Sequence, residues 1–168
     1  MSKKTIYIVI ILLAIVGLLF WFGRPDGQEV TDGSVSGDNT ATEALLPTVS
    51  AYDFGTISMA KGVVKYDYEI ENTLAIPVTI TKLYTSCMCT KANLITRTGT
   101  KGPFGMPGHG LSVPTISEIV EPGDKFTVEA IFDPAAHGPS GIGRIERAVV
   151  LETSEGNLEL NFSANVTP

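Results

Sequence analysis

Beyond residue 47 much of the chain alternates between apolar and polar residues, a pattern typical of strands with one buried face. From Val64 to Ile70 every second residue is apolar or aromatic, and the residues between them are charged. The same period of two recurs over 126–132 and 158–166. Successive side chains of a strand point to opposite faces, so each of these segments is predicted to be a half-buried strand.

Two further segments, 77–84 and 143–153, are rich in β-branched residues and are bounded by turn sequences. Residues 121–124 place Pro and Gly at the centre of a type II turn, and 154–157 suit a tight hairpin. About seven strands, with turns roughly 8 to 12 residues apart and no helical period, predict an all-β fold. The expected architecture is an immunoglobulin-like antiparallel β-sandwich over residues 47–168.

The N-terminus has a different pattern, because Thr5 to Gly23 is a run of 19 residues without a charge. As a helix this run would be about 28 Å long, close to the ~30 Å hydrocarbon thickness of a bilayer. It ends in aromatic residues and lacks the small-residue cleavage site of a signal peptide. We therefore predict one N-terminal transmembrane helix over residues 1–24, with cleavage as a signal peptide as the alternative.

Residues 25–46 carry five acidic and no basic side chains and few large apolar ones, so they are predicted to be a flexible acidic linker. Lys3 and Lys4 precede the span. Because basic residues favour the cytoplasmic side, we expect a single-pass cell-membrane protein with its N-terminus in the cytoplasm. The C-terminal domain is then extracytoplasmic, either periplasmic or at the cell surface.

Composition adds a limit on partners. The 168 residues include 12 Lys plus Arg and 18 Asp plus Glu, and three of the basic residues belong to the predicted anchor. The remaining domain is strongly acidic, whereas phosphate binding requires clustered Lys and Arg. Nucleic acid is therefore not an expected partner.

Several short sequences distributed over the domain are distinctive: Tyr52 to Ile57, Glu71 to Thr73, Ser86 to Thr90, Glu121 to Asp124 and Phe126 to Asp133. Together they resemble the bacterial domain-of-unknown-function family 1573 (DUF1573), over residues 49–166. That family is similar to the immunoglobulin-like domains named after abnormal-spindle, SPD-2 and hydin proteins, and to major sperm protein domains. The resemblance implies the sandwich fold and an exported or anchored protein, but the family carries no established biochemical activity.

The chain departs from the compact family pattern at 97–114, a Gly- and Pro-rich stretch that we predict to be an inserted loop. The only two cysteines, Cys87 and Cys89, precede it. If their segment is extended, their Cα atoms stand nearly 7 Å apart, at the outer limit for a disulfide. An intramolecular bridge would then require a sharp local bend.

Two cysteines, the only two histidines and a nearby methionine suit a soft or borderline metal ion, with copper first and zinc second. The candidate ligands are Cys87, Cys89, Met106, His109 and His137. Their spacing matches no copper or zinc motif, and the alternative is that the cysteines pack as small apolar residues and the histidines are ordinary loop residues.

The metal hypothesis depends on topology. If 91–96 and 115–120 are two separate strands in strict alternation, the cysteines and both histidine loops lie at opposite ends of the sandwich. If they form one irregular crossing, the cysteines share an end with His137, and we favour this arrangement. A separation of Cys89 from His137 well above ~10 Å would exclude a shared centre.

Three functions remain open: metal binding, thiol redox chemistry, and a binding or structural role without chemistry. We predict a membrane-anchored extracytoplasmic binding or structural module, with a copper or zinc site as its candidate chemistry and an unidentified envelope or surface protein as its partner. The alternative is a thiol redox protein that uses the Cys87/Cys89 pair. No hydrolase motif occurs, so apart from thiol redox chemistry we do not expect an enzyme.

Overall fold

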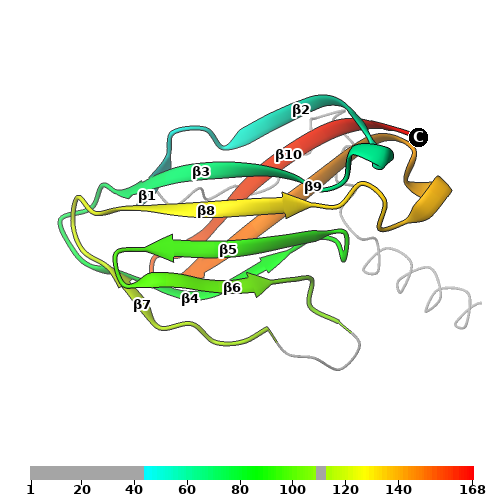
Figure 1. Cartoon of the computed structure of the whole chain (residues 1–168). Coiled ribbons are helices and arrows are strands. Elements are labelled where there is room, and N and C mark those ends of the chain that lie inside the picture. The colour runs from blue at the N-terminus through cyan, green and yellow to red at the C-terminus, as the bar shows by residue number, and fades with distance from the viewer. Residues whose placement is uncertain (1–43, 109–112) are drawn as a thin grey trace, which may run out of the picture. The chain divides into compact units, whose positions relative to one another are not determined.

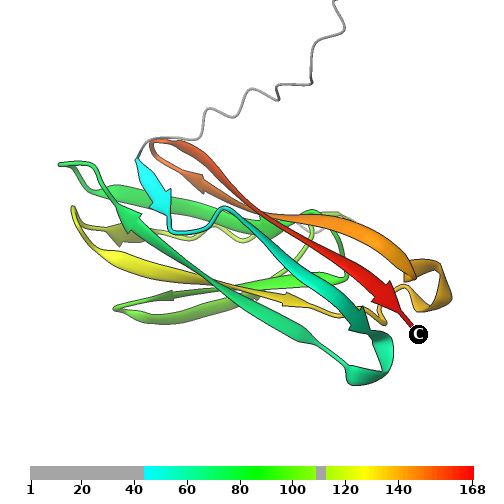
Figure 2. The same ribbon diagram turned by 90° about the horizontal axis from the view of Figure 1, so that it is seen from above.

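The computed structural model describes residues 44–108 and 113–168, which form two five-stranded β-sheets packed face to face (Figures 1 and 2). In spatial order, the first sheet contains β1 (Leu45–Pro47), β3 (Val64–Asn72), β8 (Lys125–Phe132), β5 (Thr90–Thr96) and β6 (Gly99–Phe104). The second contains β2 (Ala51–Ser58), β10 (Gly156–Thr167), β9 (Gly143–Thr153), β4 (Val78–Thr85) and β7 (Glu118–Val120).

The described ranges contain no α-helix, only the short 3₁₀ helices η1 (Met59–Lys61) and η2 (Gly138–Gly141). Within them no helix has the length and apolar character needed to cross a membrane. The predicted anchor at 1–24, and the predicted linker up to residue 43, lie outside the described residues.

The predicted all-β, immunoglobulin-like sandwich is confirmed, but the described chain has ten strands instead of about seven. One difference lies in the stretch 97–114, where Gly99–Phe104 forms strand β6 and not a loop. Thr96 pairs with Gly99 across a tight turn, so β6 folds back onto β5. A second difference is the pairing of β2 with β10, which is parallel, whereas the other strand pairs are antiparallel.

The alternating residues of the long strands form the core between the sheets. Tyr68 and Ile70 of β3, Val128 of β8 and Leu160 of β10 are each at most 1% exposed. The Tyr68 hydroxyl crosses the core and donates a hydrogen bond of 2.6 Å to the carbonyl oxygen of Asn161 in the other sheet. The period of two therefore corresponds to the observed burial.

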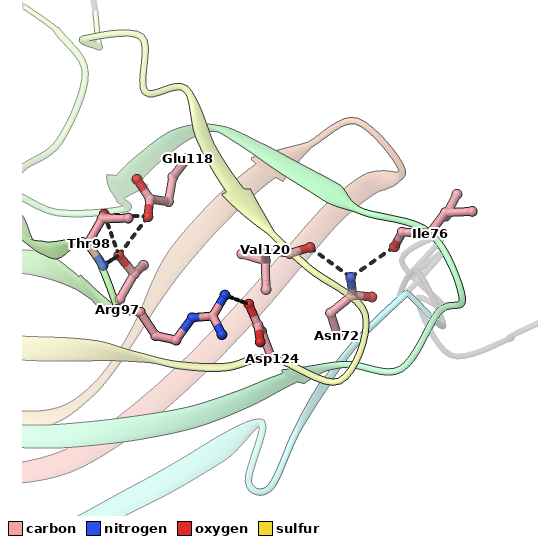
Figure 3. A network of polar contacts seen from close by, with 8 residues as sticks. Asn72, Ile76, Arg97, Thr98, Glu118, Val120 and Asp124 are labelled. Atoms are coloured by element: carbon pink, nitrogen blue, oxygen red, sulfur yellow. Dashed lines mark hydrogen bonds and ion pairs between the residues drawn. The ribbon is translucent and has the colours of Figure 1, made fainter.

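A fully buried asparagine ties one end of the sandwich together (Figure 3). The side-chain amide of Asn72 donates to the carbonyl oxygens of Ile76 (3.0 Å) and Val120 (2.9 Å) and accepts from the Leu74 N–H (3.0 Å). Its backbone N–H donates to Asp124, and its carbonyl accepts from Gly123. Gly123 has φ of 77°, as the predicted type II turn requires. Asn72 therefore holds this turn through its backbone and the chain beside β4 and β7 through its side chain.

A second polar cluster fixes the β5–β6 turn to β7 (Figure 3). The Glu118 carboxylate is 5% exposed and accepts hydrogen bonds from the hydroxyls of Thr96 and Thr98, each 2.6 Å long, and from Lys101 Nζ at 2.5 Å. Burial alone would raise the pKa of Glu118, but the hydrogen bonds from Lys101, Thr96 and Thr98 outweigh it and lower the pKa to about 2.

We expect Asn72→Ala to lower the free energy of unfolding by about 2 kcal/mol, because the buried carbonyl of Val120 loses its partner, and so do the less buried Ile76 carbonyl and Leu74 N–H. Urea denaturation of the purified protein measures this loss. Asn165→Ala, at an exposed position of β10, is the matched control and should change stability by less than about 0.5 kcal/mol. A loss for Asn72→Ala no larger than that of the control would contradict the assigned role.

Glu118→Gln tests the second cluster through pH. Because the pKa of Glu118 is lowered in the folded state, its carboxylate stabilises the fold at pH values above its ordinary pKa of 4.5. This contribution disappears as the pH falls toward about 2. The free energy of unfolding of the wild type should exceed that of Glu118→Gln by roughly 2 to 3 kcal/mol at neutral pH, and this difference should shrink as the pH falls. The exposed Glu159→Gln serves as control. A difference that does not depend on pH would show that the carboxylate charge has no such role.

Candidate functional site: the Cys87–Cys89 disulfide

Cys87, Met88 and Cys89 lie in the connection between β4 and β5, where the chain reverses direction. The Thr90 N–H donates to the carbonyl oxygen of Cys87 at 3.0 Å, which closes a β-turn over 87–90. This turn brings the Cα atoms of the two cysteines to 5.3 Å, and the cysteines form a disulfide. The segment is therefore not extended, and the sharp bend that a bridge needs is present.

Buried contacts on the β4 side position this turn. Thr85, the last residue of β4, is fully buried, and its hydroxyl lies 3.1 Å from the carbonyl oxygen of Cys87 and 3.0 Å from that of Thr90. The next residue, Ser86, pairs with β9: its N–H donates to Ala148, and its hydroxyl accepts from the Ala148 N–H. The two residues that precede Cys87 thus attach the turn to strands of both sheets.

The loop after β8 brings a histidine to the disulfide. Thr90 pairs with Phe132, so the start of β5 and the end of β8 lie at the same end of the sandwich (Figure 1). The Asp133 N–H then donates to the carbonyl oxygen of Cys89 at 2.9 Å. From there the chain continues to the exposed His137, which directly precedes η2 and places its Nε2 atom 3.2 Å from Cys87 Sγ.

Arg147 of β9 contacts the other sulfur. Its Nε–H donates to Cys89 Sγ at 3.3 Å, and its Nη1 donates to the carbonyl oxygen of Glu146 at 2.7 Å, which holds the guanidinium in place. The sequence analysis missed this residue. Arg147 is 58 residues from Cys89 and belongs to no motif, so only the pairing of β9 with β4 reveals their proximity.

The two sulfurs have different surroundings. Cys89 is 3% exposed and joins the hydrophobic core, whereas Cys87 is half-buried and Met88 between them is 65% exposed. Cys87 therefore contacts an imidazole at the edge of the core, and Cys89 contacts a guanidinium from within it. A nucleophile from solution reaches Cys87 more readily than Cys89.

The structure unites three of the five predicted ligands. Cys87 Sγ, Cys89 Sγ and a ring nitrogen of His137 all lie within 4.8 Å of one another. The cysteines and His137 lie at the same end of the sandwich, as favoured, but for another reason. Residues 90–96 and 118–120 are separate strands, not one irregular crossing, and β6 adds a further crossing that brings the chain back to the same end. Met106 follows β6 and is 42% exposed, and His109 lies outside the described residues.

Comparison with known proteins supports the family resemblance and the fold. Residues 47–105 match the model of the family described as "Protein of unknown function (DUF1573)", which confirms the predicted resemblance over this range. No curated protein matches the sequence.

Among solved structures, a protein of unknown function from Porphyromonas gingivalis W83 superimposes with a TM-score of 0.52 at 14% identity. The match covers 73% of this chain and 46% of that protein, so this chain spans less than half its length. PapD-like domain 7 of human CEP192 gives a TM-score of 0.44 at 14% identity, over 75% of this chain and 87% of that domain. At such identity the first likeness shows the fold alone.

The unequal burial predicts unequal thiol reactivity. At a pH high enough to deprotonate both thiols, reduced Cys89→Ser, which retains Cys87, should react several-fold faster with iodoacetamide than Cys87→Ser, because Cys87 is the less buried sulfur. Alkylation followed by mass spectrometry measures both rates. In denaturant the two variants should react at similar rates, and equal rates in the folded state would contradict the assigned difference in access.

Proposed function

We propose that this chain, whose residues 47–105 match the DUF1573 family, is an immunoglobulin-like module that carries out thiol–disulfide exchange through Cys87 and Cys89. One observation carries the proposal: each sulfur of a half-accessible disulfide has its own polar contact, His137 on Cys87 and Arg147 on Cys89. A purely structural bridge across three residues closes a very small loop and constrains the unfolded chain little.

The surroundings of the sulfurs suggest which sulfur is attacked and which one leaves. A thiolate of a substrate dithiol attacks Cys87 Sγ, the Cys87–Cys89 bond breaks, and its electron pair leaves on Cys89. The second thiolate of the substrate then attacks the substrate sulfur of the mixed disulfide and releases Cys87. The substrate loses two electrons and two protons and becomes a disulfide, and the two cysteines take up both. The reverse sequence reduces a substrate disulfide.

Arg147 and His137 have separate roles in this sequence. The guanidinium beside Cys89 Sγ favours the thiolate form, and a more stable thiolate leaves more readily. The imidazole beside Cys87 Sγ can hold the proton exchanged with that thiol, or donate a hydrogen bond to its thiolate. Residues 44–108 and 113–168 include no α-helix beside the cysteines, so two side chains supply what a helix N-terminus supplies in thioredoxin-like proteins.

Disulfides persist in oxidising compartments, which supports the extracytoplasmic location expected from the sequence. We propose that the N-terminal span anchors the domain to the membrane and that the acidic linker lets it reach cysteine-containing envelope or surface proteins. The substrate would then be a protein thiol on the outer side of that membrane.

Equilibration with reduced and oxidised glutathione tests the proposal. The full chain should show a reversible two-electron couple, and the Cys89→Ser variant should accumulate a mixed disulfide with glutathione at Cys87, detected by mass spectrometry. Arg147→Gln should shift the equilibrium toward the disulfide by about 10- to 100-fold, because a hydrogen bond to a charged group contributes about 1.5 to 3 kcal/mol.

Arg144→Gln is the matched control, since Arg144 is also in β9 but its guanidinium contacts Glu146 instead of a sulfur. This variant should keep the wild-type equilibrium. A disulfide that glutathione never opens, or a couple that Arg147→Gln and Arg144→Gln shift equally, would refute the exchange mechanism.

A further inference from the structure

We propose that reduction of the Cys87–Cys89 disulfide creates a Cu(I) site formed by both thiolates and Nε2 of His137, and that Arg147 makes this site select a monovalent ion. The inference goes beyond the exchange function, because it requires only that the bond can be reduced and needs no substrate thiol.

The backbone holds the three ligand atoms together independently of the sulfur–sulfur bond. The hydrogen bonds from Thr90 N–H to Cys87 and from Asp133 N–H to Cys89 involve carbonyl oxygens, so reduction leaves them in place. The ligand atoms lie within 4.8 Å of one another, and metal–sulfur and metal–nitrogen bonds are about 2.0 to 2.3 Å long. Once the sulfurs separate, an ion between the three atoms can contact all of them.

Ligand type and number favour copper over zinc. Thiolates are soft ligands and select Cu(I). Structural zinc sites are closed by four protein ligands, whereas in the described part of the chain only three His, Cys, Asp or Glu side chains converge here. Among the described residues a zinc ion therefore finds only three of its four ligands here.

Charge distinguishes Cu(I) from Zn(II) more sharply than the type and number of ligands do. Two thiolates carry two negative charges, and the Arg147 guanidinium, 3.3 Å from Cys89 Sγ, carries one positive charge. A monovalent ion with a neutral imidazole therefore makes the site neutral, whereas a divalent ion leaves one uncompensated positive charge beside a cysteine that is 3% exposed. Uncompensated charge in a poorly solvated position is costly, so Arg147 opposes zinc.

The disulfide itself switches the site. Metal ligation requires deprotonated thiolates, and the sulfurs of a disulfide carry no charge, so of the three ligands described above only the imidazole remains in the oxidised domain. A dithiol opens the bond by exchange and is itself oxidised to a disulfide, so its two electrons convert a domain without a thiolate ligand into one with two.

The test uses the full chain in detergent, reduced, freed of reductant and kept anaerobic, with Cu(I) supplied in competition with a colorimetric Cu(I) chelator and Zn(II) titrated in parallel. We expect one Cu(I) per reduced chain, none in the oxidised chain, and loss of binding in Cys87→Ser and Cys89→Ser. Arg147→Gln should bind Cu(I) about 10- to 100-fold more weakly and Zn(II) more tightly. Arg144→Gln, the control on the same strand, should change neither affinity.

Thiol quantification in each sample separates the possible failures. A chain with two free thiols that binds no Cu(I) overturns this inference and leaves glutathione exchange untouched. Cu(I) binding without glutathione exchange overturns the exchange function alone, and a bond that resists reduction in the folded chain overturns both. If Arg147→Gln moves the Cu(I) and Zn(II) affinities in the same direction, selection by charge is wrong.

Discussion

The hydrogen bond from the Asp133 N–H to the carbonyl oxygen of Cys89 is the constraint on which the site depends. It extends the pairing of β5 with β8 by one step beyond the Thr90–Phe132 pair and so fixes the loop after β8 against the cysteine turn. Without this register, a histidine 50 residues away in sequence would have no reason to lie beside Cys87. The chemistry of the site is therefore a consequence of strand alignment, in which a slip by one residue would reverse every side chain.

The fold was predictable because strand periodicity is a local property. The alternation from Val64 to Ile70 and the Pro-Gly turn at 121–124 each carry their structural meaning within a few residues, and both correspond to observed elements. Strand β6 was not predictable in the same way. Its sequence, Gly-Thr-Lys-Gly-Pro-Phe, has the composition of a loop, and it becomes a strand because β5 offers an edge to which it can pair.

The site was predictable only in part, for the same reason. Cys87, Cys89 and His137 are rare residue types, so composition alone identified them as candidates, and the structure brings them together. Arg147 is one of several arginines, and its contact with Cys89 depends on how β9 pairs with β4 across the second sheet. The disulfide could not be predicted from the sequence, because it requires a turn at 87–90 that contacts of Thr85 with Cys87 and Thr90 stabilise.

The two sulfurs differ because the sandwich has an inside and an outside. The β-turn directs Cys89 toward the core and Arg147, and leaves Cys87 half-buried at the edge of the core beside an exposed imidazole. A cation that stabilises one thiolate for exchange also counts in the charge balance of any metal bound by the same thiolates. Arg147 therefore has a role in both proposed activities. It favours the reduced form of the cysteine pair, and it limits the charge of the metal ion that this reduced form binds.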